Sequence, residues 1–189
     1  MLTTLTRLEA VLSQQRPAFF AEFRAGLTDD ALEKVPQSVR RVAHADLLAL
    51  YRWRDGQGRA GCFQNYMEFF SFEESVQAYS VLTELQLAGD FELNEWWNPG
   101  WFPVLHGPTG DCLCVDSVGT FGGTPGQIID FMHSDPSRDI VAPSLSAWIE
   151  SYCDLLDANL LDDDGCFIDS DEFVWVQGIR GFPLERTAF

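Results

Sequence analysis

Three strand-like runs separated by turns occupy the middle of the chain and limit the folds open to it. Residues 96–105 are rich in aromatic side chains, and two shorter apolar runs follow at residues 111–116 and 127–133. Glycine-containing turns at residues 107–110 and 119–126 separate these runs. Short apolar runs joined in this way pair as antiparallel neighbours. The sequence therefore predicts an antiparallel meander.

Helical patterns precede the meander. Apolar residues at the i, i+3 and i+4 spacing between Leu5 and Leu12 predict an amphipathic helix, which Pro17 interrupts or restarts. A helix-start signal at Thr28 opens a mostly helical region that ends at Trp53, before a glycine turn. We therefore expect several helices ahead of the sheet.

Further elements are expected on both sides of the meander. Residues 59–70 predict one or two short strands, and Ser71-Phe72-Glu73-Glu74 has the spacing of a capping box that begins a helix through about Leu87. From about Val141 the apolar residues follow a helical period. Residues 173–176 predict a last strand.

Length and composition indicate one packed domain. The chain has 189 residues, of which 46% are hydrophobic and 13% aromatic, enough for a sizeable core. We find no signal-peptide pattern at the N-terminus and no run that approaches the roughly 18 apolar residues of a membrane span. Five cysteines at no metal-site spacing suit buried thiols in a reducing compartment. These features predict a cytoplasmic protein with no membrane partner.

The charge is strongly negative and unevenly distributed. The net charge is −17; residues 1–60 hold nine basic and seven acidic side chains, whereas residues 61–189 hold three and 22. Such a field repels nucleic acid and steers cationic partners toward the protein. A nucleic-acid partner is therefore not expected. Two interpretations of the acidic bias stay open: it keeps the protein soluble, or it recognises a basic partner.

Four motifs follow one another in the second half of the chain, and a fifth lies upstream. They are a Trp-x-Pro-x-Trp-x-Pro motif (Trp97, Pro99, Trp101, Pro103), a Gly-Asp strand start (Gly110, Asp111), a Gly-x-Ile strand (Gly126, Ile128), an Ala-x-Ser helix start (Ala142, Ser144) and, upstream, a Leu-Tyr helix end with an Asp-Gly turn (Tyr51, Asp55, Gly56). In order and spacing, residues 28–156 resemble the SUKH superfamily, the group built around the fungal Smi/Knr cell-wall regulators. Ala43-His44 departs from the Leu-Pro that the family commonly has before its Leu-Tyr helix.

The resemblance implies an α+β fold whose mainly antiparallel sheet, of about four to six strands, is flanked by helices. It implies a SUKH-like domain at residues 28–160, an N-terminal helical extension at 1–27, and an acidic linker with a C-terminal strand at 161–189 packed on the same domain. The motif residues are then mainly structural. The resemblance also implies protein binding rather than catalysis, with no cofactor, because bacterial members are commonly immunity proteins that dock on a toxin.

These observations predict an immunity protein, or antitoxin, that neutralises a basic, nuclease-type toxin through an acidic surface. The alternative is a regulatory scaffold with endogenous partners, as in the fungal relatives; the aromatic content also leaves a homodimer open. The residues predicted to bind the partner are Asp154, Asp157, Asp162, Asp163, Asp164, Asp169, Asp171 and Glu172.

Chemical roles find little support in the sequence. With Gly165 placed at the sixth position of an EF-hand loop, Leu160 falls at the first, so a calcium ligand is missing. The acidic segment 162–172 is instead interpreted as a solvated or a partner-binding loop. Cys112 and Cys114 share one strand face and are expected to be core thiols. The three histidines, His44, His106 and His133, accompany no catalytic motif, and no metal site is expected. Trp96, Trp97 and Trp101 suit either the sheet core or an exposed patch.

Overall fold

The computed structural model describes residues 1–35, 37–59, 61–89, 96–168, 179 and 181–185. The elements, in chain order, are α1 (Leu2–Gln15), α2 (Pro17–Ala21), α3 (Asp29–Glu33), α4 (Gln37–Val42), α5 (Ala45–Trp53), β1 (Glu68–Phe69), α6 (Phe72–Ala88), β2 (Trp101–His106), β3 (Cys112–Asp116), a 3-10 turn (Thr120–Gly122), β4 (Gln127–Phe131), β5 (Ile140–Ala142) and α7 (Leu145–Asp157). This is an α+β fold, as predicted.

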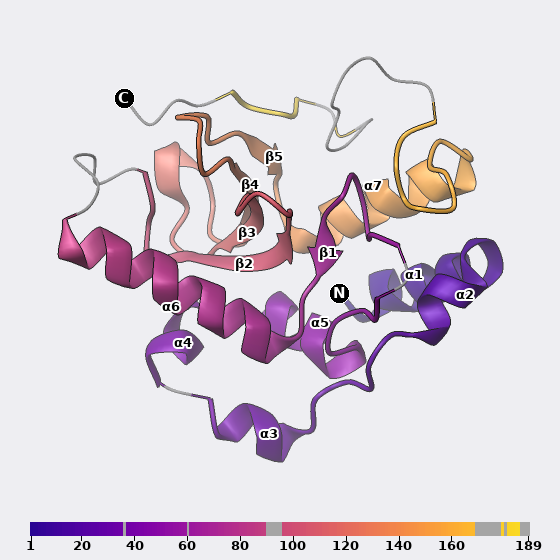
Figure 1. The fold of residues 1–189 in the computed structure, drawn as a ribbon, viewed down its shortest axis with the longest axis horizontal. Helices are drawn as coiled ribbons and strands as arrows, with labels where there is room; N and C mark the ends of the chain where they lie inside the picture. The colour runs from indigo at the N-terminus through magenta and orange to yellow at the C-terminus, as the bar shows by residue number, and fades with distance from the viewer. Residues whose placement is uncertain (36, 60, 90–95, 169–178, 180, 186–189) are drawn as a thin grey trace.

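The sheet is an antiparallel meander whose strand order follows the chain (Figure 1). The β2–β3 hairpin pairs Phe102 with Val115 and His106 with Cys112, and an irregularity after Pro103 shifts the register by one residue. β4 continues the ladder on β3, and β5 closes that side. The three strand-like runs therefore pair as the turns between them predicted, although the third run ends at Phe131, two residues early.

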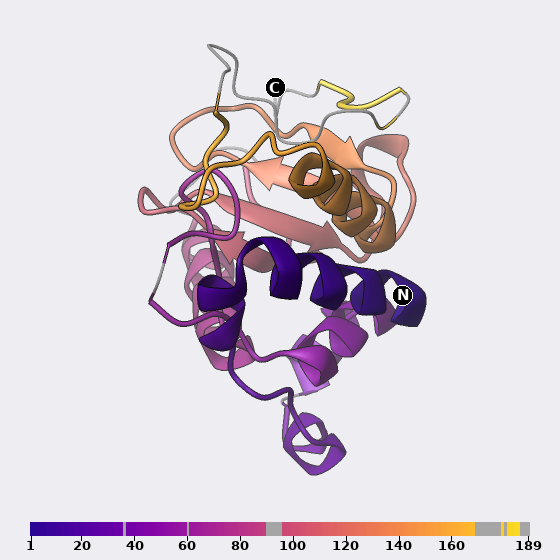
Figure 2. The same cartoon turned by 90° about the vertical axis from the view of Figure 1, so that its right-hand side faces the viewer.

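Helices pack on the sheet and on one another. α6 runs along β2 and places Phe72 and Tyr79 against Phe102 (Figure 1). α7 packs against β4 and β5, and α1 lies along α7 (Figure 2). No helix among the described residues is long and apolar enough to cross a membrane.

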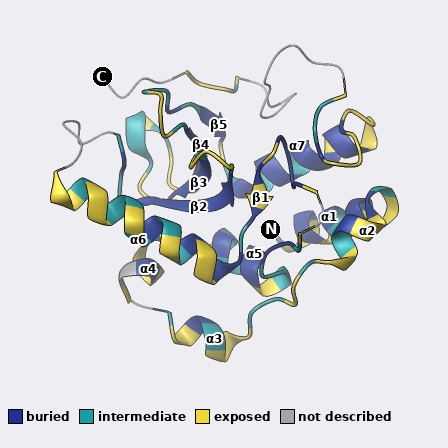
Figure 3. Cartoon of the chain, viewed as in Figure 1, coloured by how far each residue is buried: buried dark blue, intermediate teal, exposed yellow. Residues whose placement is uncertain are grey.

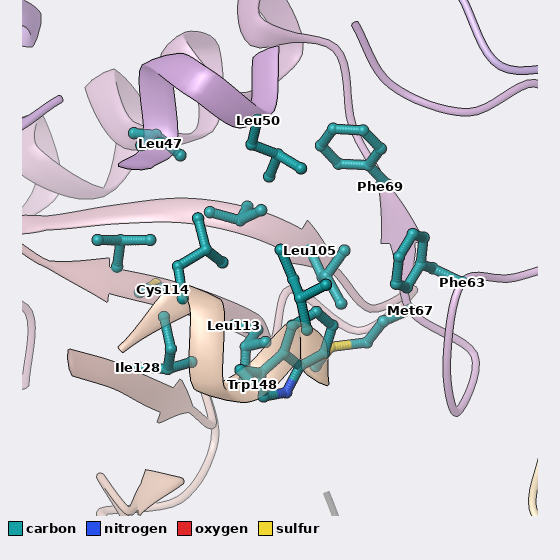
Figure 4. Packing of buried hydrophobic residues seen from close by; sticks show 14 of the residues in the cluster. Leu47, Leu50, Phe63, Met67, Phe69, Leu105, Leu113, Cys114, Ile128 and Trp148 are labelled. Carbon is teal, nitrogen blue, oxygen red and sulfur yellow. The ribbon is translucent and has the colours of Figure 1, made fainter. Parts of the chain in front are cut away.

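A single hydrophobic cluster joins these layers. Leu47 and Leu50 of α5, Leu113 and Ile128 of the sheet, and Trp148 of α7 all belong to it (Figure 4). Leu5, Leu8 and Leu12 of α1 belong to the same cluster. The first helix is therefore packed with the rest of the chain, as its apolar spacing predicted.

The beginning of α6 is held by the upstream motif. Tyr51 donates to or accepts from Ser75 over 2.9 Å, and the Asp55 carboxylate accepts from the Phe72 N–H at 2.7 Å. Gly56 has φ +85°, and its backbone passes the chain at Ser71 so closely that a side chain has no room. Ser71 itself begins α6 with the predicted capping box. The motif thus fixes where α5 ends relative to where α6 begins.

The remaining motif residues lie in or beside the sheet. Trp97, Trp101, Ile128 and Ala142 are buried, so these two tryptophans are core residues, and Trp96 is partly buried against Phe131. Pro103 lies in β2, and the Pro99 carbonyl accepts a hydrogen bond from the Tyr79 hydroxyl. Gly110 closes the turn before β3, and the Asp111 carboxylate accepts from the His133 N–H. Gly126 donates its N–H to the Asp116 carbonyl, and Ser144 caps α7 by accepting from the Ala147 N–H.

The predicted start of the last helix is wrong. The helix expected from about Val141 begins at Leu145, and residues 140–142 form β5 instead. Pro143 has no N–H and fixes its own φ, and the Ser144 side chain caps the helix after it, so the apolar residues before the proline are left to pair with β4. The strand predicted at residues 173–176 lies outside the described residues.

Candidate partner-binding surface

The predicted acidic residues fall into two groups. Asp154 and Asp157 lie on α7, and Asp162, Asp163 and Asp164 lie in the loop that follows it. Asp169, Asp171 and Glu172 lie outside the described residues. The two groups that the structure describes have different surroundings.

The α7 carboxylates surround one arginine of α1. Arg7 contacts Glu150 at 2.7 Å, Asp154 at 2.7 Å and Asp157 at 2.8 Å. The hydrogen bond from Arg7 holds the pKa of Glu150 below its usual range. These side chains join α1 to α7, so their charge is partly compensated within the protein.

The loop of residues 161–168 presents its carboxylates to solvent. Leu161 and Phe167 form an antiparallel bridge, and the Asp162 carboxylate accepts from the Cys166 N–H at 2.7 Å. Asp162, Asp163 and Asp164 are exposed on this turn, which follows α7 in Figure 3. The acidic loop is thus a defined turn, at least as far as residue 168.

A buried arginine from the N-terminal segment anchors this loop. Arg16 is 5% exposed, and its guanidinium donates to the carbonyl oxygens of Cys62 at 2.9 Å, Phe63 at 3.1 Å and Asp163 at 3.1 Å. It also contacts the Tyr152 hydroxyl at 3.2 Å. One cation therefore ties α1, the 62–63 segment, α7 and the acidic loop together.

Tyr66 stands beside the acidic loop and is 66% exposed. Tyr66 and the preceding Asn65 have φ values of 63° and 49°, in the left-handed region. Asn65 is 6% exposed, and its Nδ2 makes no hydrogen bond within the described residues. An exposed aromatic side chain therefore projects from a backbone conformation that non-glycine residues rarely adopt.

Two hollows flank Tyr66. One, of about 230 Å³, is lined by residues that include Asn65, Tyr66, Met67, Pro108 and Met132. The other, of about 490 Å³, is lined by residues that include Cys62, Tyr66, Glu68, Asp162, Asp164 and Cys166. We call Tyr66, Glu68, Asp162, Asp163 and Asp164 the Tyr66 surface.

The sequence predicts three of the five residues of this surface. The three aspartates were expected, whereas Tyr66 and Glu68 were interpreted only as part of a strand segment, and Arg16 was not singled out. An exposed aromatic residue has no sequence signal that separates it from the buried Phe63 and Phe69 nearby. Only the fold shows that Tyr66 points outward.

The histidines have local roles. The His44 ring accepts from the Asp46 N–H at the start of α5, and His133 contacts Asp111 at 3.4 Å. His106 is buried under the Phe70 ring.

The Cys112 Sγ lies 3.5 Å from the His106 Nδ1. A hydrogen bond with Cys114, and to a smaller extent the one with His106, lowers the pKa of Cys112 to about 6. Cys112 and Cys114 are nevertheless core thiols, as predicted, 1% and 0% exposed. Among the described residues, no group of three or more His, Cys, Asp or Glu side chains is placed to hold a metal ion.

Comparison with known proteins gives one result. The model of the SMI1 / KNR4 family (SUKH-1) matches residues 26–151, about two thirds of the chain. No curated protein matches the sequence. The matched segment contains Tyr66 and Glu68, whereas Arg16 and the acidic loop lie outside it.

Proposed function

Because this chain belongs to the SMI1 / KNR4 family (SUKH-1), a family of protein-interaction and immunity-type domains that are generally non-catalytic, we propose that it is an immunity protein that neutralises a basic, nuclease-type toxin. The toxin docks on the Tyr66 surface, and the protein performs no chemistry of its own. The observation that carries the proposal is the exposed Tyr66, held in a left-handed backbone conformation beside carboxylates that face solvent.

The backbone at Tyr66 supports a role in binding. A non-glycine residue in the left-handed region costs roughly 1 kcal/mol, and such strain gathers at sites of function. The Tyr66 ring is mostly in water, so burial does not offset that cost. Tyrosine is enriched among the residues that dominate binding energy, because it buries a large area with few rotatable bonds. A partner that covers the ring would recover the apolar area that folding leaves exposed.

The charge around Tyr66 supports a basic partner. Among the described residues, Glu68, Asp162 and Asp164 line one hollow together with a single basic residue, Arg59. An arginine or lysine of a partner placed there would contact both the carboxylates and the tyrosine ring. A protein that cleaves nucleic acid needs a basic groove for its substrate, so an acidic surface that fills this groove blocks the substrate as well.

Charge reversal of the acidic loop tests the proposal. We expect the triple variant Asp162→Lys, Asp163→Lys, Asp164→Lys to bind the toxin at least ~10-fold more weakly, mostly through slower association, because steering depends on the sign of the field. The tagged protein captures its partner from native lysate at low salt, mass spectrometry identifies it, and titration of the purified pair gives the affinity. The captured protein should be toxic when expressed alone and harmless with the wild-type chain.

The matched control is Asp30→Lys, Glu33→Lys, Glu84→Lys, which makes the same change in net charge at exposed positions elsewhere. This control should bind nearly as the wild type does. Equal loss in both triple variants would show that only net charge matters. Capture of several non-toxic partners, unaffected by either triple variant, would favour the regulatory scaffold.

Replacing Tyr66 with glycine separates binding from folding. We expect Tyr66→Gly to weaken toxin binding at least ~10-fold and to leave the free energy of unfolding unchanged or raised by up to about 1 kcal/mol, because glycine adopts positive φ without strain. Isothermal titration and urea denaturation measure the two effects. Tyr66→Ala is the control, since it removes the ring but keeps the backbone strain.

The two variants should bind equally weakly, with Tyr66→Gly the more stable of the pair. Wild-type affinity in both variants would remove Tyr66 from the docking site. A large loss of stability in Tyr66→Gly would instead give the ring a structural role.

A further inference from the structure

Two cysteines from distant parts of the chain lie side by side at the edge of the Tyr66 surface. Both line the hollow of about 490 Å³, and the Cys62 thiol donates at 2.6 Å to the carbonyl of Asp164, two residues before Cys166. Backbone hydrogen bonds join their segments: the Cys62 N–H donates to the Asp164 carbonyl at 3.2 Å, and the Asn65 N–H donates to the Gly165 carbonyl at 3.0 Å. The proximity of the thiols is therefore built into the fold.

The other three cysteines have different surroundings. Cys112, Cys114 and Cys153 are at most 1% exposed, in the sheet and in α7. Cys166 is partly exposed, and Cys62 is 8% exposed. All five are free thiols. Only the Cys62–Cys166 pair combines a neighbouring thiol with a surface hollow.

We propose that Cys62 and Cys166 are an oxidation site, at which a low-molecular-weight disulfide converts the two thiols into an intramolecular disulfide. The Cys166 thiolate attacks one sulfur of the reagent, whose S–S bond breaks and releases the first thiolate. The Cys62 thiolate then attacks the Cys166 sulfur of the mixed disulfide and releases the second. The two cysteines lose two electrons to the reagent, and their two protons leave with the released thiols.

Exposure sets the order of these steps. Cys166 is the more accessible thiol, so it meets the reagent first. Burial raises the pKa of Cys62 to about 11, so this thiol is mostly protonated near neutral pH and reacts only when the mixed disulfide is held next to it. Ring closure should therefore be slower than the first exchange and should accelerate as pH rises.

The disulfide would join the acidic loop covalently to the segment that carries Tyr66. The loop could then no longer move away from the tyrosine ring, so oxidation would hold the Tyr66 surface in its docking geometry. This effect on partner binding rests on the proposed function, whereas formation of the disulfide does not.

The test uses the full-length protein and oxidised glutathione. After the remaining thiols are blocked, a protease that cleaves after Glu and Asp separates the Cys62 peptide from Cys112 and Cys114 at Glu68, and the Cys166 peptide from Cys153 at Asp157. Mass spectrometry should find the Cys62 and Cys166 peptides cross-linked, and dithiothreitol should release them. The cross-linked protein should melt at least ~4 °C higher than the reduced protein.

Variants define the site. Cys153→Ala should cross-link as the wild type does, whereas Cys166→Ser should leave Cys62 as a free thiol. Glutathione bound stably at Cys166 without ring closure, a cross-link to another cysteine, or five unreacted thiols would each overturn the proposal. A cross-link in a protein that captures no toxin would leave the oxidation site intact and reject the proposed function alone.

Discussion

Replacing Arg16 with methionine is expected to lower the free energy of unfolding by about 3–5 kcal/mol. The methionine keeps much of the apolar stem but donates no hydrogen bond. The carbonyl oxygens of Cys62 and Asp163 lose the donor that Arg16 supplies, whereas the Phe63 carbonyl keeps the Tyr152 hydroxyl at 2.8 Å. Buried acceptors without a donor carry the full cost of leaving water. Urea denaturation followed by tryptophan fluorescence measures the loss.

Arg52→Met is the matched control. Arg52 contacts Asp29 at 2.9 Å, but the two side chains are 48% and 79% exposed, so the pair contributes at most about 1 kcal/mol. The same substitution is made in both variants, so the difference between their free energies of unfolding measures the effect of burying the arginine. A loss below about 1 kcal/mol in Arg16→Met would show that water or a rearranged loop replaces the guanidinium.

The Arg16→Met variant also tests whether the Tyr66 surface binds the partner. Because Arg16 holds the acidic loop through the Asp163 carbonyl, its removal should weaken binding of the proposed partner even under conditions where Arg16→Met stays folded. Unchanged affinity in a folded Arg16→Met protein would mean that the loop keeps its position through its other contacts.

Gly56→Ala is expected to destabilise the protein by about 3 kcal/mol or more. At φ +85° an alanine is strained, and its Cβ would lie 2.5 Å from the Ser71 N and 2.8 Å from the Phe70 carbonyl carbon. Both are backbone atoms at the start of α6, so a rotamer change cannot relieve the overlap. The helix must shift, and its capping box and its contact with Asp55 shift with it. Thermal or urea denaturation measures the change.

Gly89→Ala is the control at the other end of the same helix. Gly89 has φ +78°, and a Cβ there meets no atom of a described residue within 4 Å, so the expected cost is the backbone strain of about 1–2 kcal/mol. The difference between the two variants is the cost of the close approach at Ser71. Equal losses would mean that the start of α6 accommodates the methyl group added at position 56 at no cost beyond the backbone strain.

Most of the secondary structure could be predicted from short sequence patterns. The capping box at Ser71, the apolar spacing from Leu5 to Leu12 and the turn at residues 107–110 each depend on residues within one or two turns of chain, and all three elements form as expected. The error at β5 has the same origin. Its three residues include the strand formers Ile140 and Val141, but so short an apolar run cannot be told from the start of a helix by periodicity, and β4 beside it makes it a strand.

The candidate site was less predictable because it is built from distant segments. Three exposed aspartates could be identified from their clustering, but their relation to Tyr66 could not. Asp154 and Asp157 are equivalent to them by sequence alone, yet α1 supplies Arg7 to this pair, whereas no ion pair joins Asp164 to another described residue. Charge counts do not distinguish a carboxylate that joins two helices from one that faces a partner.

The sequence by itself determined most of the helices, the antiparallel pairing of β2, β3 and β4, and the family, because these depend on periodicity, turn residues and motif order over short stretches of chain. Only the tertiary structure decided that Arg16, the 62–68 segment and the acidic loop share one site. Bringing these three segments together requires long loops to close around a common core. The free energy that offsets this loop closure comes from packing and buried hydrogen bonds, and not from the secondary-structure preference of any one segment. No pattern within any one segment therefore predicts that the three lie together.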